Sequence, residues 1–317
     1  MPAIPQVVRL CSVSIDLDEI ACYAQIHGLE SAVAMHAVYD VALNRARAFA
    51  ANLALPLTLF VVASDLDRPT NLQTLRTCVR EGHEIGNHSL DHFYDLTRRS
   101  QAEQERQVVG ANERMRDVLG VSPSGFRAPG YTVTDELLAV VQRSGLTYDS
   151  SVFPSPPYYA AKAGQLLRMK ASRQSSRAVL DTPRVLRAPT APYRVGQPYW
   201  RPGRGLLELP IQVAGPLRIP FIGTTLSLLG PRAARLLARS LIGTEFVNLE
   251  LHGVDFLDAH DVPIALLAVQ RDLRVPLARK LESFKAVIGL LRQHSYRTVR
   301  LDAAAQAFDQ TAVGIPR

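Results

Sequence analysis

The chain has 317 residues, of which 47% are hydrophobic and 21% charged, together with 19 Gly, 21 Pro and 3 Cys. These values exclude a disordered, collagen-like or disulfide-stapled chain, and they are typical of a globular protein that buries a sizeable core. The net charge of +7 is uneven, because residues 1–150 hold 13 Arg against 18 acidic residues and the positive excess lies in the second half. We therefore expect a local anionic partner rather than a uniformly basic surface.

Hydrophobic periodicity alternates between strand and helix along most of the chain. Repeated alternation of this kind implies an α/β sheet or barrel with helices on the outside. The spacing predicts strands over residues 7–15, 57–63, 83–86, 246–251 and 296–301, and helices over 29–53, 70–81, 101–119, 135–144 and 275–294.

Residues 152–206 interrupt the alternation. The segment is rich in Pro, Gly, Ser and Tyr, and it holds ten Lys or Arg residues against the single acid Asp181. A long irregular stretch inside a compact domain is usually a lid, a binding loop or disorder. We expect one domain over residues 1–317, with 152–206 as a basic insertion or lid within it.

The compartment follows from what the sequence lacks. The N-terminal residues show no basic and apolar pattern of a secretory signal, and no run approaches the ~18 apolar residues of a membrane span. Cys11, Cys22 and Cys78 have neither paired nor metal-binding spacing, so we expect reduced, buried thiols. The sequence predicts a cytoplasmic protein.

Four clusters of chemically active side chains fall at the ends of predicted strands. Asp16 and Asp18 share one face of the first strand, and His88 and His92 would lie on one face if residues 88–92 form a helix. Two imidazoles and one carboxylate complete a three-ligand set for a zinc-like ion. The clusters are Asp16-Leu17-Asp18, His88-Ser89-Leu90-Asp91-His92, Phe126-Arg127-Ala128-Pro129-Gly130-Tyr131 and Glu250-Leu251-His252-Gly253.

Each cluster also has a structural explanation. The Asp-Leu-Asp sequence is common in helix caps and turns, and paired histidines are often ordinary surface or core residues. Arg127 is equally a structural ion-pair partner, and His252 a hydrogen-bonded core histidine. The coincidence of all four clusters at strand ends favours chemistry.

The order SIDLDE, HEIGNHSLDH, FRAPGYT and LELHG resembles the polysaccharide deacetylase (NodB-homology) family of carbohydrate esterases. The resemblance covers roughly residues 8–150 and 206–305, and the spaced first motif is similar to a cytoplasmic branch with lipid-linked aminosugar deformylases and allantoinase-like amidohydrolases. It implies a distorted (β/α) barrel of the NodB-homology type with a long basic insertion, and a divalent metal ion, Zn²⁺ first, with Co²⁺, Ni²⁺ or Mn²⁺ as alternatives.

The resemblance also implies roles for individual residues. Metal ligands would be Asp18, His88 and His92, while Asp16 would be the general base that deprotonates the attacking water. Because Leu17 separates two aspartates that are adjacent in most of the family, an exchange of roles between Asp16 and Asp18 stays open. The remaining assignments are Arg127 as the partner of Asp16, His252 as the general acid, Gly130 as an oxyanion donor, Tyr131 beside the substrate, and Asp149 as a residue that tunes His252, binds substrate or forms a turn.

The insertion indicates the substrate. Aromatic rings stack on sugars and Arg binds phosphate, so Tyr158, Tyr159 and Trp200 among the basic residues favour an N-acyl amino sugar, free or linked to phosphate or lipid. The apolar run 216–229 would suit contact with the inner face of the cytoplasmic membrane, although a plain core strand explains it equally. The predicted function is metal-dependent N-deacetylation or N-deformylation. Alternatives are hydrolysis of a small cyclic ureide and non-catalytic binding of anionic glycans, whereas nucleic acid is not expected.

Overall fold

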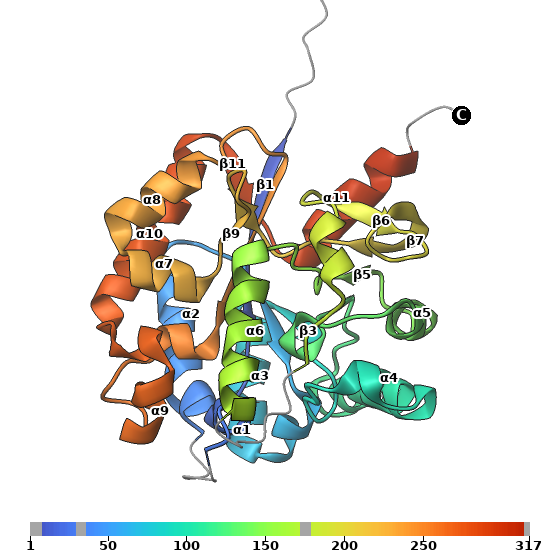
Figure 1. The fold of residues 1–317 in the computed structure, drawn as a ribbon, viewed down its shortest axis with the longest axis horizontal. Helices are drawn as coiled ribbons and strands as arrows, with labels where there is room; N and C mark the ends of the chain where they lie inside the picture. The colour runs from blue at the N-terminus through green and yellow to red at the C-terminus, as the bar shows by residue number, and fades with distance from the viewer. Residues whose placement is uncertain (1–7, 30–35, 172–178, 314–317) are drawn as a thin grey trace, which may run out of the picture.

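The computed structural model of the protein describes residues 8–29, 36–171 and 179–313. Its elements alternate between strand and helix, as the sequence predicts (Figure 1). The strands are β1 (Arg9–Asp16), β2 (Leu57–Val61), β3 (Glu84–Asn87), β4 (Gly125–Phe126), β5 (Tyr148–Asp149), β6 (Tyr193–Val195), β7 (Pro202–Glu208), β8 (Val213–Ala214), β9 (Ile219–Pro220), β10 (Phe246–His252) and β11 (Tyr296–Thr298). The α-helices are α1 (Ile20–Ile26), α2 (Leu43–Asn52), α3 (Pro69–Arg80), α4 (Gln101–Leu119), α5 (Asp135–Arg143), α6 (Pro156–Ala171), α7 (Gly223–Leu229), α8 (Pro231–Arg239), α9 (Ile264–Val269), α10 (Leu277–Gln293) and α11 (Leu301–Val313).

The main sheet is curled like part of a barrel. Its strand order is β10-β1-β2-β3-β4-β5-β7-β6, with β11 paired to the start of β1, and every pairing is parallel except that of β6 with β7. Helices lie around it, with α2, α8 and α10 on one side and α4 and α5 on the other in Figure 1. The α/β prediction is confirmed, and the carboxyl ends of the strands meet at one edge of the sheet.

The central strands β1 and β10 are buried because helices cover both faces of a parallel sheet, although Ser12, Ser14, Asn248 and Glu250 alternate with their apolar residues. Of the eight residues of β1, all but Arg9 are buried. The two strands pair in register over their whole length, so that Asp16 stands beside His252 at their carboxyl ends. Polar residues therefore appear where the buried strands stop, and the sheet itself positions them.

Helix termini follow capping chemistry. Ser100 and Thr134 accept hydrogen bonds from the backbone N–H three residues on, at the starts of α4 and α5, and Gly120 ends α4 with φ of 70°. Of the helix expected over 29–53, residues 30–35 lie outside the described residues, and the described part opens with a π-helical turn, Val38–Ala42, that continues into α2. The Glu19 carboxylate caps Ile20 and also accepts from Val38 and Tyr39 at the start of this turn.

Residues 152–206 are more ordered than the sequence predicts. They contain the helix α6, which runs down the middle of the view in Figure 1, and strands β6 and β7 at one end of the main sheet. Gly203 and Gly205 allow β7 to approach β6, since a Cβ on either would stand within 3.0 Å of Val195 or Gly196 backbone atoms. The sequence did not predict a helix here, because α6 begins with two prolines and its apolar residues show only a weak helical periodicity.

The apolar run 216–229 is not a plain strand. It forms the short strand β9, which pairs with β8, followed by the helix α7. Within the described parts of the chain, no helix combines the length and hydrophobicity needed to cross a membrane. Among the three free cysteines, Cys11 and Cys78 are buried and Cys22 is partly exposed.

Candidate active site

Three side chains converge where β1 and β3 end. Oδ1 of Asp18 lies 3.0 Å from Nε2 of His88 and 3.1 Å from Nε2 of His92, and all three residues are buried. Within the described residues, none of these three atoms has a hydrogen-bond partner. A buried acceptor facing two imidazole nitrogens without hydrogen bonds is the arrangement expected of ligands to one cation.

The sequence pattern placed the two histidines together on one face of a helix. The segment that carries them is not helical. Residues 88–92 form a loop in which Ser89 and His92 have φ of 67° and 53°. Asn87 fixes this turn because its Oδ1 accepts from Ser89 N–H at 2.7 Å, and Ser89 Oγ accepts from His92 N–H at 3.1 Å. The tight loop, rather than one face of a helix, brings the rings to 4.8 Å between centroids.

The tautomer of His88 is fixed by the backbone. Its Nδ1 lies 2.7 Å from the carbonyl oxygen of Arg127 and donates to it. The Nε2 lone pair is therefore directed at Asp18 and at the space between the ligands. Burial alone would raise the pKa of Asp18, but the imidazoles of His92 and His88 hold it well below its usual range.

Asp16 and Arg127 form a buried ion pair beside this group. Nη1 of Arg127 donates to Asp16 Oδ1 at 2.7 Å and to Ser14 Oγ at 2.9 Å. The guanidinium also lies 4.2 Å from the centroid of the Phe60 ring. Burial raises the pKa of Asp16, and the charges of Arg127 and His88 oppose that rise. Arg127 thus holds a carboxylate that the interior would otherwise protonate.

The loop after β5 holds the other side of the guanidinium. Arg127 donates from Nε to the Ser150 carbonyl and from Nη2 to Ser150 Oγ, both at 2.8 Å. Asn248 of β10 donates to the same hydroxyl at 2.9 Å. Neither Ser150 nor Asn248 was assigned a role from the sequence. Ser150 directly follows β5, whereas Asn248 lies inside β10, where an amide among apolar residues was the signal.

His252 is held by a residue that sequence reasoning missed. Its Nδ1 lies 2.9 Å from Oε1 of Glu250, and its Nε2 lies 2.9 Å from the Tyr131 hydroxyl, which donates to Glu250 at 3.0 Å. Burial opposes the charge of the imidazole, but Glu250 raises the pKa of His252 well above its usual value. The signal was available, since residues two apart on a strand lie on the same face.

The structure contradicts the suggestion that Asp149 tunes His252. Asp149 lies opposite Glu208 in the β5–β7 pairing and accepts from Ser151 Oγ at 2.7 Å. Ser151 Oγ in turn accepts from the N–H of Ala128 at 2.8 Å, next to Arg127. Asp149 therefore supports the loop that carries Arg127 and Gly130, in agreement with the turn alternative.

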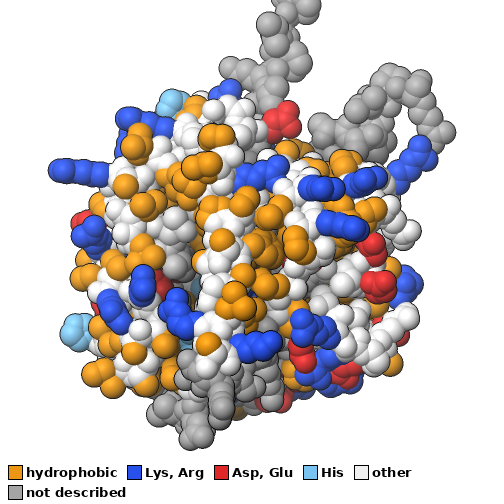
Figure 2. Space-filling view, in the orientation of Figure 1, with side chains coloured by type: hydrophobic (Ala, Val, Ile, Leu, Met, Phe, Trp, Pro, Cys, Tyr) orange, Lys and Arg blue, Asp and Glu red, His pale blue; other side chains and the backbone are white. Residues whose placement is uncertain are grey.

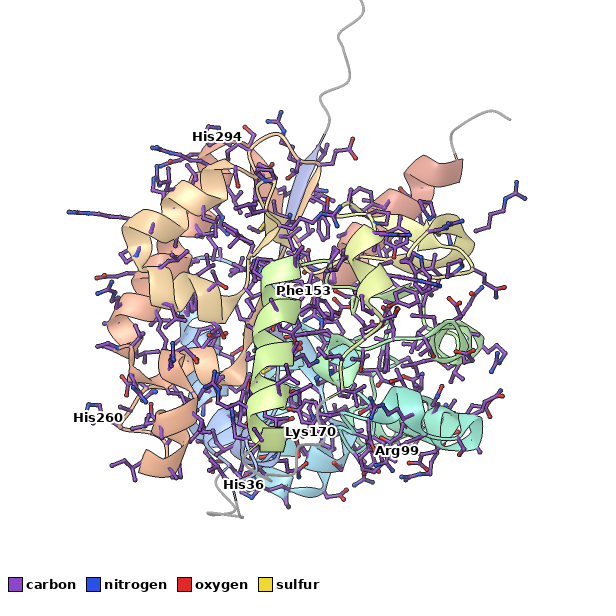
Figure 3. The ribbon with its side chains drawn as sticks, in the orientation of Figure 1. His36, Arg99, Phe153, Lys170, His260 and His294 are labelled. Atoms are coloured by element: carbon purple, nitrogen blue, oxygen red, sulfur yellow. The ribbon has the colours of Figure 1, made fainter. Side chains whose placement is uncertain are left out.

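A cavity of about 410 Å³ opens above these groups. It reaches Asp16, Asp18 and His252 at its base, and α6 forms one wall through Tyr158 and Lys162. Figure 3 shows Phe153 near the start of α6 and Lys170 at its other end, so the helix lies along the cavity. The wall is largely apolar, and the other lining residues are Tyr23, Ile26, His27, Tyr94, Gly130, Tyr131, Pro157, Ala161, Gln165, Leu166, Pro220, Ile222, Thr224, Thr225, Val269 and Gln270.

Gly130 and Tyr131 lie where this cavity meets the strand ends. Both have left-handed backbone, with φ of 64° and 59°, and the Gly130 carbonyl accepts from Lys162 Nζ at 2.9 Å. Burial lowers the pKa of Lys162 to about 8, against the attraction of Asp181. A non-glycine residue held at positive φ is typical of a site whose geometry is imposed by its neighbours.

Two predicted substrate residues lie away from the cavity. Tyr159 is buried and packs its ring edge against Tyr158, with 5.4 Å between centroids. Trp200 lines a separate hollow with Thr134 and Leu180. Only Lys162 among the ten basic residues of 152–206 lines the cavity; Arg173 and Arg177 lie outside the described residues. Among the described residues of 152–206, Lys162 is therefore the basic side chain that lines this cavity.

Fold and site together define an α/β protein with a candidate metal centre at the carboxyl ends of its parallel strands. Residues 44–148 match the family model for polysaccharide deacetylase, a stretch that includes His88, His92 and Arg127. Over this stretch, about a third of its length, the chain is similar to the polysaccharide deacetylase family.

Two relatives of known assignment share part of the chain. It is 37% identical over 93 residues to the chitooligosaccharide deacetylase of Sinorhizobium fredii, and 34% identical over 92 residues to that of a Bradyrhizobium species. Each alignment spans 29% of this chain and 41% of the relative. The similarity therefore covers less than half the length of either relative.

Solved structures match over nearly the whole chain. A Mycobacterium smegmatis protein assigned to the polysaccharide deacetylases superposes with a TM-score of 0.60 at 18% identity, covering 99% of this chain and 95% of its own. A Pseudomonas aeruginosa protein with the same assignment gives 0.59 at 14% identity, covering 97% and 93%. At such identities the likeness extends to the fold, and it supports the curled (β/α) sheet described above.

Proposed function

We propose that the protein removes the acyl group from an N-acyl amino sugar by hydrolysis of the amide bond, assisted by a divalent metal ion. The observation that carries the proposal is that two buried groups of opposite function face one cavity. The Asp18–His88–His92 cluster lies beside the Asp16–Arg127 pair, and Asp16 in turn lies within 4.8 Å of the ligand atoms of His252 and Glu250. Asp16, Asp18 and His252 line the cavity.

The donor set fits a cation. Asp18, His88 and His92 each offer one buried ligand atom within 4.8 Å of the others, and none of these atoms is used elsewhere in the described chain. Two nitrogens and one oxygen favour Zn²⁺, with Co²⁺, Ni²⁺ or Mn²⁺ as alternatives. When bound, such an ion polarises the amide carbonyl and lowers the pKa of the attacking water.

The geometry supports Asp16 rather than Asp18 as the base. Asp18 contacts both imidazoles, whereas Asp16 is held by Arg127 at 2.7 Å, with its other oxygen 3.9 Å from His88 Nε2. Asp16 accepts the proton of the attacking water, and Arg127 keeps the carboxylate ionised and oriented.

His252 delivers the second proton. Glu250 favours the imidazolium, so His252 is protonated before the carbon–nitrogen bond breaks and transfers a proton to the leaving amine. Gly130 lines the cavity, and in this proposal its backbone N–H donates to the oxygen that gains charge during attack. Lys162 holds this turn through the Gly130 carbonyl.

The substrate is the finer part of the proposal. A cavity of about 410 Å³ accommodates one acylated sugar unit, and the Tyr158 and Tyr131 rings at its wall supply apolar surface for a sugar face. A phosphate or lipid attached to the sugar, and action at the inner face of the cytoplasmic membrane, remain parts of the same proposal. Leu228 of α7 is 50% exposed and lines the hollow next to this cavity, which favours contact with an apolar chain.

The test measures acetate or formate release together with metal content. Wild-type protein, metal-free protein and the variants Asp16→Asn and His252→Ala are compared on N-acetyl and N-formyl amino sugars. We expect both variants to retain one equivalent of metal and to lose about 10²-fold or more in rate. A fully active Asp16→Asn variant with normal metal content would show that the base is wrongly assigned.

Hydrolysis of a small cyclic ureide is a second candidate. The small cavity and the absence of the insertion's arginines from its described lining favour a compact, uncharged substrate. Release of ammonia or a ureido acid from a cyclic ureide, together with no acyl release from amino sugars, would support this alternative.

A further inference from the structure

A second cavity adjoins the first. It has a volume of about 580 Å³ and lies between α6, α7 and the segment that follows α9. Both cavities are lined by His27, Ala161, Gln165, Thr224, Val269 and Gln270. The shared wall makes them two compartments of one cleft rather than separate hollows.

The partition between them is a hydrogen-bonded bridge. Gln165 Nε2 donates to Nδ1 of His27 at 3.1 Å, and His27 Nε2 lies 3.3 Å from Gln270 Oε1 and donates to it. The bridge joins the end of α1, the middle of α6 and the end of α9. Burial lowers the pKa of His27, which suits a neutral ring bonded at both nitrogens. The bridge is polar and narrow, so a ligand that fills the first cavity can extend past it.

The far compartment is rich in unused polar groups. Arg168 of α6 and Arg271 are exposed, and neither forms an ion pair with a residue that the structure describes. Asp272 lines the same cavity but is 1% exposed, and its Oδ2 has no hydrogen-bond partner among the described residues. Its charge faces Lys280 at 3.9 Å, so the two arginines keep a net positive field at the mouth.

The apolar surroundings set this compartment apart from an ordinary solvated surface. Leu228, Met169 and Val269 line it, and Figure 2 shows hydrophobic side chains down the centre of this face, with Lys and Arg side chains on both flanks. Guanidinium groups at the edge of an apolar hollow bind phosphate oxygens more strongly than in open water. A buried carboxylate with a free acceptor position complements a hydroxyl donor.

We propose that this second compartment binds a phosphate ester attached to the substrate, with Arg168 and Arg271 on the phosphate and Asp272 on a neighbouring hydroxyl. The identity of the attached N-acyl group rests on the proposed function, whereas the phosphate site itself does not. The phosphate belongs either to a soluble sugar phosphate or to the headgroup of a lipid-linked sugar.

The first arm of the test measures binding without catalysis. Metal-free protein in EDTA is titrated calorimetrically with N-acetylglucosamine 1-phosphate and with N-acetylglucosamine. We expect the phosphate ester to bind more tightly, and each of Arg168→Gln and Arg271→Gln to weaken it about tenfold. Arg201→Gln, an exposed arginine of the same 152–206 segment outside both cavities, is the matched control and should bind as wild type does.

The second arm identifies the source of the phosphate. Wild-type protein and the Arg168→Gln/Arg271→Gln double variant are sedimented with vesicles of phosphatidylcholine alone or with phosphatidic acid added. Arginine-dependent binding to the anionic vesicles supports a lipid headgroup, and arginine-dependent binding only to the soluble ester supports a free sugar phosphate.

The inference is overturned if both single variants match wild type in the calorimetric arm and the double variant matches wild type in the vesicle arm. Its failure is distinct from failure of the proposed function. Arginine-dependent phosphate binding without acyl release from any N-acyl sugar would support the phosphate site and contradict the proposed reaction. Acyl release without phosphate binding would support the proposed reaction and contradict the phosphate site.

Discussion

Replacing Arg127 by Ala removes the guanidinium that donates to Asp16, and with it four hydrogen bonds. Both residues are at most 1% exposed, so the remaining carboxylate stays buried at the base of the cavity without its guanidinium partner. Breaking a buried ion pair by removing one partner costs about 3–5 kcal/mol, a large part of the free energy of unfolding of a typical domain. We expect Arg127→Ala to lose stability in that range.

A double-mutant cycle separates the charge from the packing. Adding Asp16→Asn to Arg127→Ala removes the isolated charge, so the double variant should be more stable than the sum of the single effects predicts, by about 1–3 kcal/mol. The assay is urea unfolding followed by circular dichroism in EDTA. Arg143→Ala, which breaks the exposed pair with Glu105, is the control and should change stability by about 0–1 kcal/mol. Strictly additive losses would refute the reasoning.

Three further outcomes are expected. Glu250→Gln should lower kcat about 10²-fold and move the basic limb of the pH–rate profile to lower pH, because Glu250 raises the pKa of His252. Glu208→Gln should flatten the pH dependence of the urea midpoint. Burial and the Asp149 carboxyl raise the pKa of Glu208 well above 4.5 in the folded protein. The contribution of Glu208 to stability is therefore full below pH 4.5 and is lost as the pH rises through the folded pKa. Zn²⁺ at 100 times its Kd should stabilise wild type by about 2.7 kcal/mol in thermal unfolding, and His92→Ala should not respond.

Each of these has an outcome that contradicts it. An unchanged basic limb in Glu250→Gln would mean that the proton comes from another group. Equal pH dependence of wild type and Glu208→Gln would mean that Glu208 is ionised in the folded protein. A full Zn²⁺ response in His92→Ala would place the ion elsewhere.

The candidate site residues were visible in the sequence, whereas the loops and hydrogen bonds that position them were not. Strands followed by Asp16, His88 and His252 were visible because buried parallel strands are apolar runs that end in polar residues. The loop at residues 88–92 was not, because its shape depends on Asn87 and on two left-handed residues that no periodicity reports. Local propensity could not supply these contacts.

The segment 152–206 shows a second limit. Its composition indicated a lid, yet α6 packs as a wall of the cavity and β7 pairs with β5 in the main sheet. The pairing of Asp149 with Glu208, 59 positions further along the chain, is decided by tertiary contacts, which composition does not encode. Glu250 was overlooked for a simpler reason, since a buried acid in a strand suggests a structural role until its partner His252 is seen 2.9 Å away.

The in-register pairing of β1 with β10 makes the proposed base and acid neighbours through the backbone alone. Side chains alternate between the two faces of a strand, so a shift of one residue in this pairing would turn either Asp16 or His252 to the opposite face while keeping both strands hydrogen-bonded. A single-residue insertion or deletion within either strand would therefore be more damaging to chemistry than to folding. In variant libraries of this protein, length changes in these two strands should yield folded but inert molecules, and length changes in the loops that follow should not.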